Sequence, residues 1–341
     1  MTAKTRPFGQ TADGQTVQAI MIGTADLTVT LLTFGAAVQD VRLRGVARSL
    51  TLGGPDMAAY LGPMGYFGTV VGPVANRIAG ARATIAGRGH HFPPNEGTTL
   101  LHGGASGTQT RVWGLDDATA TSARLSLTLP DGQGGFPGRR QIIAEYAVSD
   151  ATLTLTLSAS TDAPTLMNLA NHSYWNLNDT PTTAGHILTV AAETWLPTTA
   201  DGIPTGEQRA VAGAFDLRKG RVIDGTEGFD HNFCLCPAPR ALTDVATLTG
   251  DHLRLTLATT EPGLQVYDGR ALNTGPFPGR SGHPYGPYAG MALEAQHWPD
   301  APHQPGFPPV TLDPGGVYRQ VTQWRFDRVQ DKFADAGRIC I

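Results

Sequence analysis

Apolar and polar side chains alternate with a period of two along most of this chain. The alternation is clearest in residues 27–31, 124–129, 152–157 and 253–257. Successive side chains of a strand point to opposite faces, so this pattern predicts strands with one buried and one solvated face. Strands of that kind are typical of antiparallel sheets.

Turn residues separate the alternating runs, and no long helical pattern lies between them. The chain has 42 Gly and 25 Pro, and turns are expected at residues 131–135 and 313–316. Helices are expected only as short turns, such as one around residues 57–60, which disfavours a parallel α/β fold. The pattern therefore predicts an all-β fold, a large antiparallel β-sandwich.

Composition indicates the number of domains and excludes some classes of partner. No linker, charge block, internal repeat or low-complexity tract divides the sequence, so residues 1–341 are expected to form a single domain. With 40% hydrophobic and 16% charged residues, the chain can bury a sizeable core. A formal net charge of -4 gives no basic surface, so nucleic acid and membranes are not expected as partners and neutral small molecules fit better.

Targeting signals and cysteines indicate the compartment. Residues 1–7 lead into Gly and Gln rather than an apolar run, and no segment approaches about 18 consecutive apolar residues. We therefore expect a cytoplasmic protein. Cys234, Cys236 and Cys340 suit neither a disulfide framework nor a C-x-x-C metal pair, and are expected to be free thiols.

Five segments break the alternation and concentrate Asn, Arg, His, Asp, Glu and aromatic residues: 75–80, 101–104, 171–177, 228–232 and 291–300. Sugar hydroxyls both donate and accept hydrogen bonds, so a sugar site needs amides, carboxylates, Arg and His, together with aromatic faces for the C–H surface of the ring. Several of these segments supply both kinds of side chain. They are candidates for a carbohydrate site.

Glu294 and His172 are the candidate proton-transfer groups. Glu294 ends an alternating run among amide, imidazole and aromatic residues, although a strand glutamate is more often a solvated surface group. His172 could equally be a hydrogen-bonded core histidine. A metal site is not expected, because His90 and His91 point to opposite faces of a strand and no H-E-x-x-H spacing occurs. No G-x-S-x-G turn supports a serine hydrolase.

Taken in order, these motifs resemble the aldose 1-epimerase family, also called galactose mutarotases. The resemblance runs from residues 34–36 to residues 324–326 and covers nearly the full length. The segments that carry it are Asn76-Arg77-Ile78-Ala79-Gly80, Leu101-His102-Gly103-Gly104, Asn171-His172-Ser173-Tyr174-Trp175-Asn176-Leu177, Phe229-Asp230-His231-Asn232-Phe233, Pro262-Gly263-Leu264-Gln265-Val266-Tyr267 and Leu293-Glu294-Ala295-Gln296-His297-Trp298-Pro299.

The resemblance implies a large β-sandwich whose concave face holds a free aldose. It implies Glu294 as general base on the anomeric hydroxyl and His172 as general acid on the ring oxygen, with neither cofactor nor metal. The sugar ring would open to an aldehyde and close on the opposite face. The substrate-binding residues carried over by motif position are Asn76, Arg77, His102, Ser173, Tyr174, Asp230 and Gln265.

Structural roles compete with each of these binding roles. Arg77 could pair with a carboxylate, His102 could cap a glycine-rich turn, Asp230 could form an Asx turn and Gln265 could be a strand-edge amide. Two other functions also stay open. One is a catalytically silent carbohydrate sensor on the same fold, and the other is an epimerase of hexose 6-phosphates. The preferred aldose (hexose or pentose) and the choice between monomer and homodimer are left undecided, and residues 106–113 depart from the family pattern.

Overall fold

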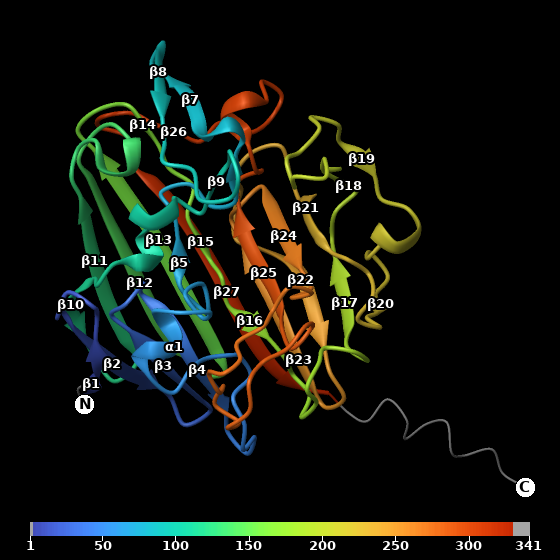
Figure 1. The fold of residues 1–341 in the computed structure, drawn as a ribbon. Coiled ribbons are helices and arrows are strands. Elements are labelled where there is room, and N and C mark those ends of the chain that lie inside the picture. The colour runs from blue at the N-terminus through green and yellow to red at the C-terminus, as the bar shows by residue number, and fades with distance from the viewer. Residues whose placement is uncertain (1–2, 330–341) are drawn as a thin grey trace, which may run out of the picture.

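The computed structural model describes residues 3–329, and strands make up nearly all of its regular structure (Figure 1). Every pairing between the named strands is antiparallel. The predicted all-β, antiparallel fold is confirmed. Three of the predicted alternating runs, 124–129, 152–157 and 253–257, lie in three strands of the largest sheet, and residues 27–31 lie in the N-terminal sheet.

The largest sheet has nine strands. In spatial order they are β10 (Gly114–Ala118), β11 (Ser122–Leu129), β12 (Arg140–Ser149), β13 (Thr152–Thr161), β27 (Tyr318–Arg328), β23 (Leu253–Thr259), β22 (Thr243–Thr249), β17 (Ile187–Val190) and β20 (Arg221–Val222).

A six-stranded sheet carries the candidate site. Its order is β16 (Tyr174–Trp175), β25 (Met291–Gln296), β24 (Gly263–Tyr267), β21 (Asp230–Cys234), β18 (Thr194–Trp195) and β19 (Arg209–Ala210). A four-stranded sheet contains β1 (Lys4–Gln10), β2 (Thr16–Gly23), β3 (Leu27–Leu32) and β4 (Ala37–Leu43).

Short strand pairs and turns complete the fold. The pairs are β5 (Val70–Val71) with β15 (Ala170–Asn171), β6 (Arg77–Ile78) with β9 (Leu100–Leu101), β7 (Arg82–Ile85) with β8 (Arg88–His91), and β14 (Thr165–Leu166) with β26 (Thr311–Leu312). The short helix expected near residues 57–60 is α1 (Met57–Tyr60), capped by the Asp56 carboxylate, which accepts from the Ala59 N–H. Single turns of 3-10 helix occur at Ala79–Ala81, Gly104–Ser106, Thr108–Thr110, Gln133–Gly135, Gly213–Phe215 and Ala301–His303.

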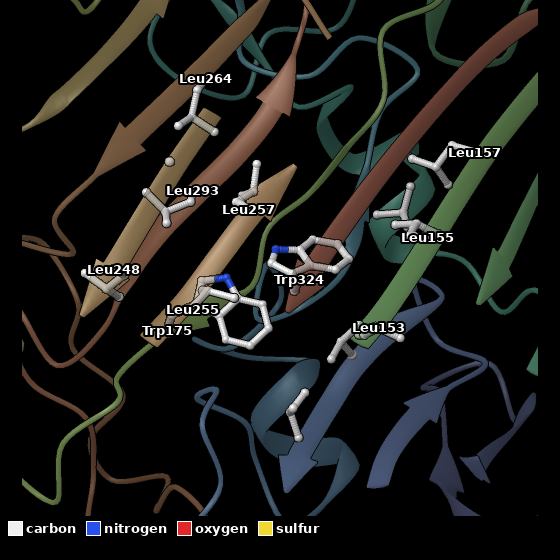
Figure 2. Packing of buried hydrophobic residues seen from close by; sticks show 14 of the residues in the cluster. Leu153, Leu155, Leu157, Trp175, Leu248, Leu255, Leu257, Leu264, Leu293 and Trp324 are labelled. Carbon is white, nitrogen blue, oxygen red and sulfur yellow. The ribbon is translucent and has the colours of Figure 1, made fainter. Parts of the chain in front are cut away.

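The main core lies between the nine-stranded sheet on one side and the six-stranded and four-stranded sheets on the other, and Figure 2 shows part of it. Leu153 on β13 and Leu257 on β23 both lie opposite Trp324 on β27, and the Trp324 ring packs 5.9 Å from that of Trp175. Leu293 on β25 packs in the same cluster. Because side chains alternate along a strand, burying Leu293 against the large sheet turns its neighbour Glu294 to the other face.

Two remaining predictions can be compared with the described residues. Cys234 and Cys236 are free thiols, as expected, whereas Cys340 lies outside the described part of the chain. Within residues 3–329, no helix combines the length and apolar character needed to span a bilayer.

Candidate active site

Three neighbouring strands of the six-stranded sheet bring one row of polar side chains together. Strand register puts Asn232 on β21 opposite Gln265 on β24, and Gln265 opposite Glu294 on β25. All three are nearly fully buried. Glu294 therefore lies on a strand that is paired on both sides within the sheet.

His172 comes from the segment between β15 and β16 and reaches the same place. Its backbone is bonded at both ends, with the His172 N–H donating to Thr69 O and the Gly68 N–H donating to His172 O. The Asn171 side chain reinforces this arrangement by donating to Gly68 O and accepting from the Ser173 N–H. The Asn-His-Ser part of the motif therefore orients the histidine.

The imidazole of His172 faces the carboxyl of Glu294. Nε2 of His172 lies 3.6 Å from Oε1 of Glu294, and both residues are buried. The ring stacks on Tyr66 at 5.8 Å between centroids and packs against Tyr174 at 4.9 Å. Among the described residues, Nδ1 of His172 and Oε2 of Glu294 have no hydrogen-bond partner.

Burial sets the protonation of this pair. It raises the pKa of Glu294 to about 8, with the Asp230 carboxylate adding to the rise and Arg77 opposing it. Burial also lowers the pKa of His172 to about 4. At neutral pH the free pair therefore carries one proton, and that proton lies on Glu294.

His102 presents a hydrogen-bond donor to the cavity. The Asn76 N–H donates to Nδ1 of His102 at 3.0 Å, and the His102 N–H donates to Asn76 O at 2.9 Å. Burial lowers the pKa of His102 well below its usual value, and the nearby His172 and Arg77 lower it further. A neutral ring that accepts at Nδ1 must carry its proton on Nε2.

Close backbone packing explains why the residue after His102 is a glycine. Gly103 has a φ of 75°, and a Cβ at this position would lie 2.1 Å from Gly72 O. Only glycine allows this approach of two backbone segments.

Arg77 lies between two carboxylates. Its Nε and Nη2 donate to the two oxygens of Glu96 at 2.6 and 2.9 Å, whereas Nη1 lies 3.8 Å from Asp230 Oδ2. Burial works against the charged form of Arg77, but the hydrogen bonds to Glu96 and the charge of Asp230 raise its pKa overall. Gln265 Nε2 donates to Asp230 Oδ1 at 2.7 Å and fixes that carboxylate.

These groups surround a cavity of about 440 Å³. Seven of the sequence-predicted residues line it: Asn76, Arg77, His102, His172, Tyr174, Asp230 and Glu294. Ser173 and Gln265 do not. The Ser173 hydroxyl is buried without a hydrogen-bond partner among the described residues, and Gln265 contacts Asp230 instead of lining the cavity.

The sequence reasoning missed several lining residues, including Tyr66, Phe67, Glu96, Tyr267, Arg270, Leu272 and Asn273. Usable signals existed for Glu96 and Tyr267. A half-buried arginine such as Arg77 needs an acidic partner, and Glu96 lies in the turn just before the Leu101-His102 motif. Tyr267 ends one of the motifs that carry the resemblance. The other aromatic and rim residues had no motif to mark them.

Three potential metal ligands come together in the cavity, which their sequence spacing did not indicate. One ligand atom from each of His102, His172 and Glu294 lies within 4.8 Å of the others. His102 does not fit this role, because its Nδ1 accepts a backbone N–H and its Nε2 therefore holds a proton instead of a free lone pair. Two ligands are left, too few for a resident zinc site.

The chain matches a known protein family over most of its length. The sequence model of the aldose 1-epimerase family matches residues 18–325. The chain belongs to the aldose 1-epimerase family. The resemblance drawn from the motifs is thereby confirmed.

Individual members of the aldose 1-epimerase family match over almost their whole length. The chain is 35% identical to galactose mutarotase of Rattus norvegicus over 334 residues, covering 94% of this chain and 97% of that protein. It is 31% identical to aldose 1-epimerase of Escherichia coli K12, covering 92% and 96%. Among solved structures, galactose 1-epimerase of Lactobacillus acidophilus superposes with a TM-score of 0.83 at 26% identity, covering 96% of this chain and 99% of that one.

Proposed function

We propose that this protein is an aldose 1-epimerase, an isomerase that interconverts the α and β anomers of free aldoses. The observation that carries the proposal is the buried His172–Glu294 pair, 3.6 Å apart in a cavity that Arg77, His102 and Asp230 also line. Relatives named galactose mutarotase and aldose 1-epimerase support it.

The pair can supply both proton transfers that the reaction requires. Glu294 takes the proton of the anomeric hydroxyl while His172 gives one to the ring oxygen, so the bond between C1 and the ring oxygen breaks and an aldehyde forms. After rotation about the C1–C2 bond, the hydroxyl attacks the other face of the aldehyde and both protons return. No net proton is gained or lost.

These roles need a carboxylate and a protonated imidazole, whereas the free pair has its proton on Glu294. Both forms carry one proton in total, so a transfer across the 3.6 Å contact converts one into the other. Hydrogen bonds from a bound sugar to the carboxylate would favour the charged form. We therefore propose that sugar binding moves the proton to His172.

The remaining side chains bind and orient the sugar. Arg77 and His102 offer N–H donors, Asp230 offers acceptors, and Asn76 and Tyr174 line the same cavity. Gln265 acts through Asp230, because it holds that carboxylate and does not line the cavity. Ser173 stays a candidate binding residue through its place beside His172.

Anomer exchange of freshly dissolved galactose, glucose, arabinose and xylose, followed by polarimetry or NMR, tests the proposal. Catalysed exchange of at least one free aldose is expected. Binding without exchange would indicate a sensor, and exchange of glucose 6-phosphate alone would indicate a hexose 6-phosphate epimerase. The site favours neither alternative, because a pure binder needs no proton-transfer pair and Arg77 is already paired with Glu96.

Several finer features belong to the same proposal. We infer a single domain, supported by one hydrophobic cluster that includes residues from Ile20 to Phe326. We also propose that the substrate is a free hexose or pentose, that the protein is cytoplasmic, that no cofactor takes part, and that the protein is a monomer or homodimer.

A further inference from the structure

Glu96 contacts the sugar-binding Arg77 along one whole edge of its guanidinium group. Two nearly parallel hydrogen bonds, of 2.6 and 2.9 Å, join Nε and Nη2 of Arg77 to the two oxygens of Glu96. This two-bond edge is the one with which arginine binds a phosphate or a carboxylate. Nη1, on the other side, lies 3.8 Å from Asp230, beyond hydrogen-bond distance.

The turn that carries Glu96 is fixed to the strand pair that carries Arg77. The Asn95 side chain accepts from the Leu101 N–H and donates to Leu101 O, and Leu101 on β9 pairs with Arg77 on β6. The guanidinium is also covered from one side, because a Cβ on Gly202 would lie 2.9 Å from its Cζ. Arg77 therefore has little freedom to turn another edge toward a ligand.

Resting on the proposed function, we propose that Glu96 is a specificity-determining residue that keeps anionic sugars out of the site. It occupies the edge of Arg77 that a sugar phosphate or a uronic acid would bind, and it leaves Nη1 for a neutral hydroxyl. A hydroxyl between Nη1 and Asp230 can accept from the first and donate to the second, which an anion cannot do.

The charge balance of the cavity supports the same role. Arg77 and Arg270 line it, and their two positive charges are matched by Glu96 and Asp230. Removing the charge of Glu96 leaves one excess positive charge beside a free two-bond edge. The Glu96 side chain is 40% exposed, so its ion pair contributes little to folding stability and can be removed without unfolding the protein.

Two substitutions separate the effect of the Glu96 charge from the effect of its hydrogen bonds to Arg77. In Glu96→Gln the charge is lost but the amide oxygen still accepts one N–H of Arg77, whereas Glu96→Ala frees the whole edge. Glu207→Gln is the matched control, because Glu207 makes the same two-bond pair with Arg209 and does not line the cavity.

The experiment measures kcat/KM for anomer exchange of galactose and of galacturonate, and inhibition of galactose exchange by glucose 6-phosphate. The ratio of kcat/KM for galactose to that for galacturonate should fall about tenfold or more in both Glu96 variants, since the freed edge of Arg77 can make charge-assisted hydrogen bonds to the carboxylate of galacturonate. Inhibition by glucose 6-phosphate should strengthen in parallel. KM for galactose should rise more in Glu96→Ala than in Glu96→Gln, with kcat little changed.

An unchanged galactose-to-galacturonate ratio and unchanged inhibition in both folded Glu96 variants would overturn the inference, as would an equal change in Glu207→Gln. If a Glu96 variant does not fold, Glu96→Asp, which keeps the charge but withdraws it from Arg77, takes its place and should show a smaller shift in the same direction. Failure of the wild-type protein to exchange any free aldose would contradict the proposed function instead, so the two failures are distinct.

Discussion

Nε2 of His172 lies 3.6 Å from Oε1 of Glu294, although the two residues are far apart in the sequence. The remaining side-chain atoms, Nδ1 of His172 and Oε2 of Glu294, have no hydrogen-bond partner among the described residues. The pair is thus held by packing and by its own contact. This isolation couples the protonation of one group to that of the other.

Replacing the carboxyl of Glu294 should remove most of the activity. Glu294→Gln is expected to lower kcat by about 10²- to 10⁴-fold, because the amide keeps the shape but takes up no proton. Polarimetry with freshly dissolved galactose measures the loss. Glu145→Gln, which changes an exposed carboxylate on β12, serves as the control. More than half of the wild-type rate in a normally melting Glu294→Gln protein would exclude this residue as the base.

The pH profile should identify which group controls each limb. Because the pKa of His172 is about 4 and that of Glu294 about 8, the free pair holds one proton between these values. We expect a bell-shaped kcat/KM whose alkaline limb reports loss of the pair's single proton and whose acid limb reports gain of a second one. The residual activity of Glu294→Gln should lack the acid limb, because the amide is not a base that protonation removes, and should fall with rising pH as His172 loses its proton. An acid limb that persists in Glu294→Gln would contradict the assignment of Glu294 as the base.

Stability should also depend on pH through Glu294. The folded protein keeps this proton up to about pH 8, whereas the unfolded chain loses it near the ordinary value of 4.5. The folded state binds more protons in this window, so the free energy of unfolding of the wild type falls as pH rises. Glu294→Gln does not titrate and should gain stability relative to the wild type between about pH 5 and 8.

Urea denaturation at several pH values measures that gain. Glu207→Gln is the control, since the hydrogen bond from Arg209 lowers the pKa of Glu207 and gives no gain of this sign. Equal pH dependence in wild type and Glu294→Gln would mean that Glu294 is not buried with a raised pKa.

Sugar affinity should depend on Arg77 and Asp230. Arg77→Ala and Asp230→Ala are each expected to weaken binding by roughly 1.5–3 kcal/mol, the usual worth of a hydrogen bond to a charged group. Gln265→Ala should have a smaller effect, because it acts only by holding Asp230. Calorimetric titration with galactose measures all three. Unchanged affinity in the first two variants would locate the sugar elsewhere.

Activity should survive removal of metals. His102 holds its cavity-facing proton on Nε2, so the two histidines and Glu294 do not form a complete ligand set. After exhaustive dialysis against EDTA, anomer exchange without added nucleotide should continue at the original rate. A loss restored by zinc but not by magnesium would contradict the proposed acid–base mechanism.

The alternation of side chains was enough to predict the fold class, because it reflects the two faces of each strand. It also explains why Leu293 faces the core and Glu294 the cavity. The alternation could not predict the strand order, because nothing in the sequence near Gln265 specifies that Asp230 and Glu294 lie on the neighbouring strands. Register between distant strands is decided by the packing of the whole sheet.

For the site, too, the sequence predicted some features and missed others. Motif resemblance identified the seven predicted residues that line the cavity, but it also suggested Ser173 and Gln265, which lie beside or behind it. Glu96 and Tyr66 were missed because their positions depend on how the turns fold over the sheet. Nothing in the sequence spacing indicated that His102 approaches His172 and Glu294.

The alternation along β25 also disfavours a form in which this strand is shifted in register. A shift of β25 by a single residue would turn Glu294 into the layer between the sheets and Leu293 into the sugar cavity. The desolvation of an unpaired carboxyl among leucines and tryptophans would make that shifted form unstable. The packing that stabilises the sandwich therefore also selects the strand register in which Glu294 faces the cavity. A stably folded protein has its proton-transfer group in the correct orientation.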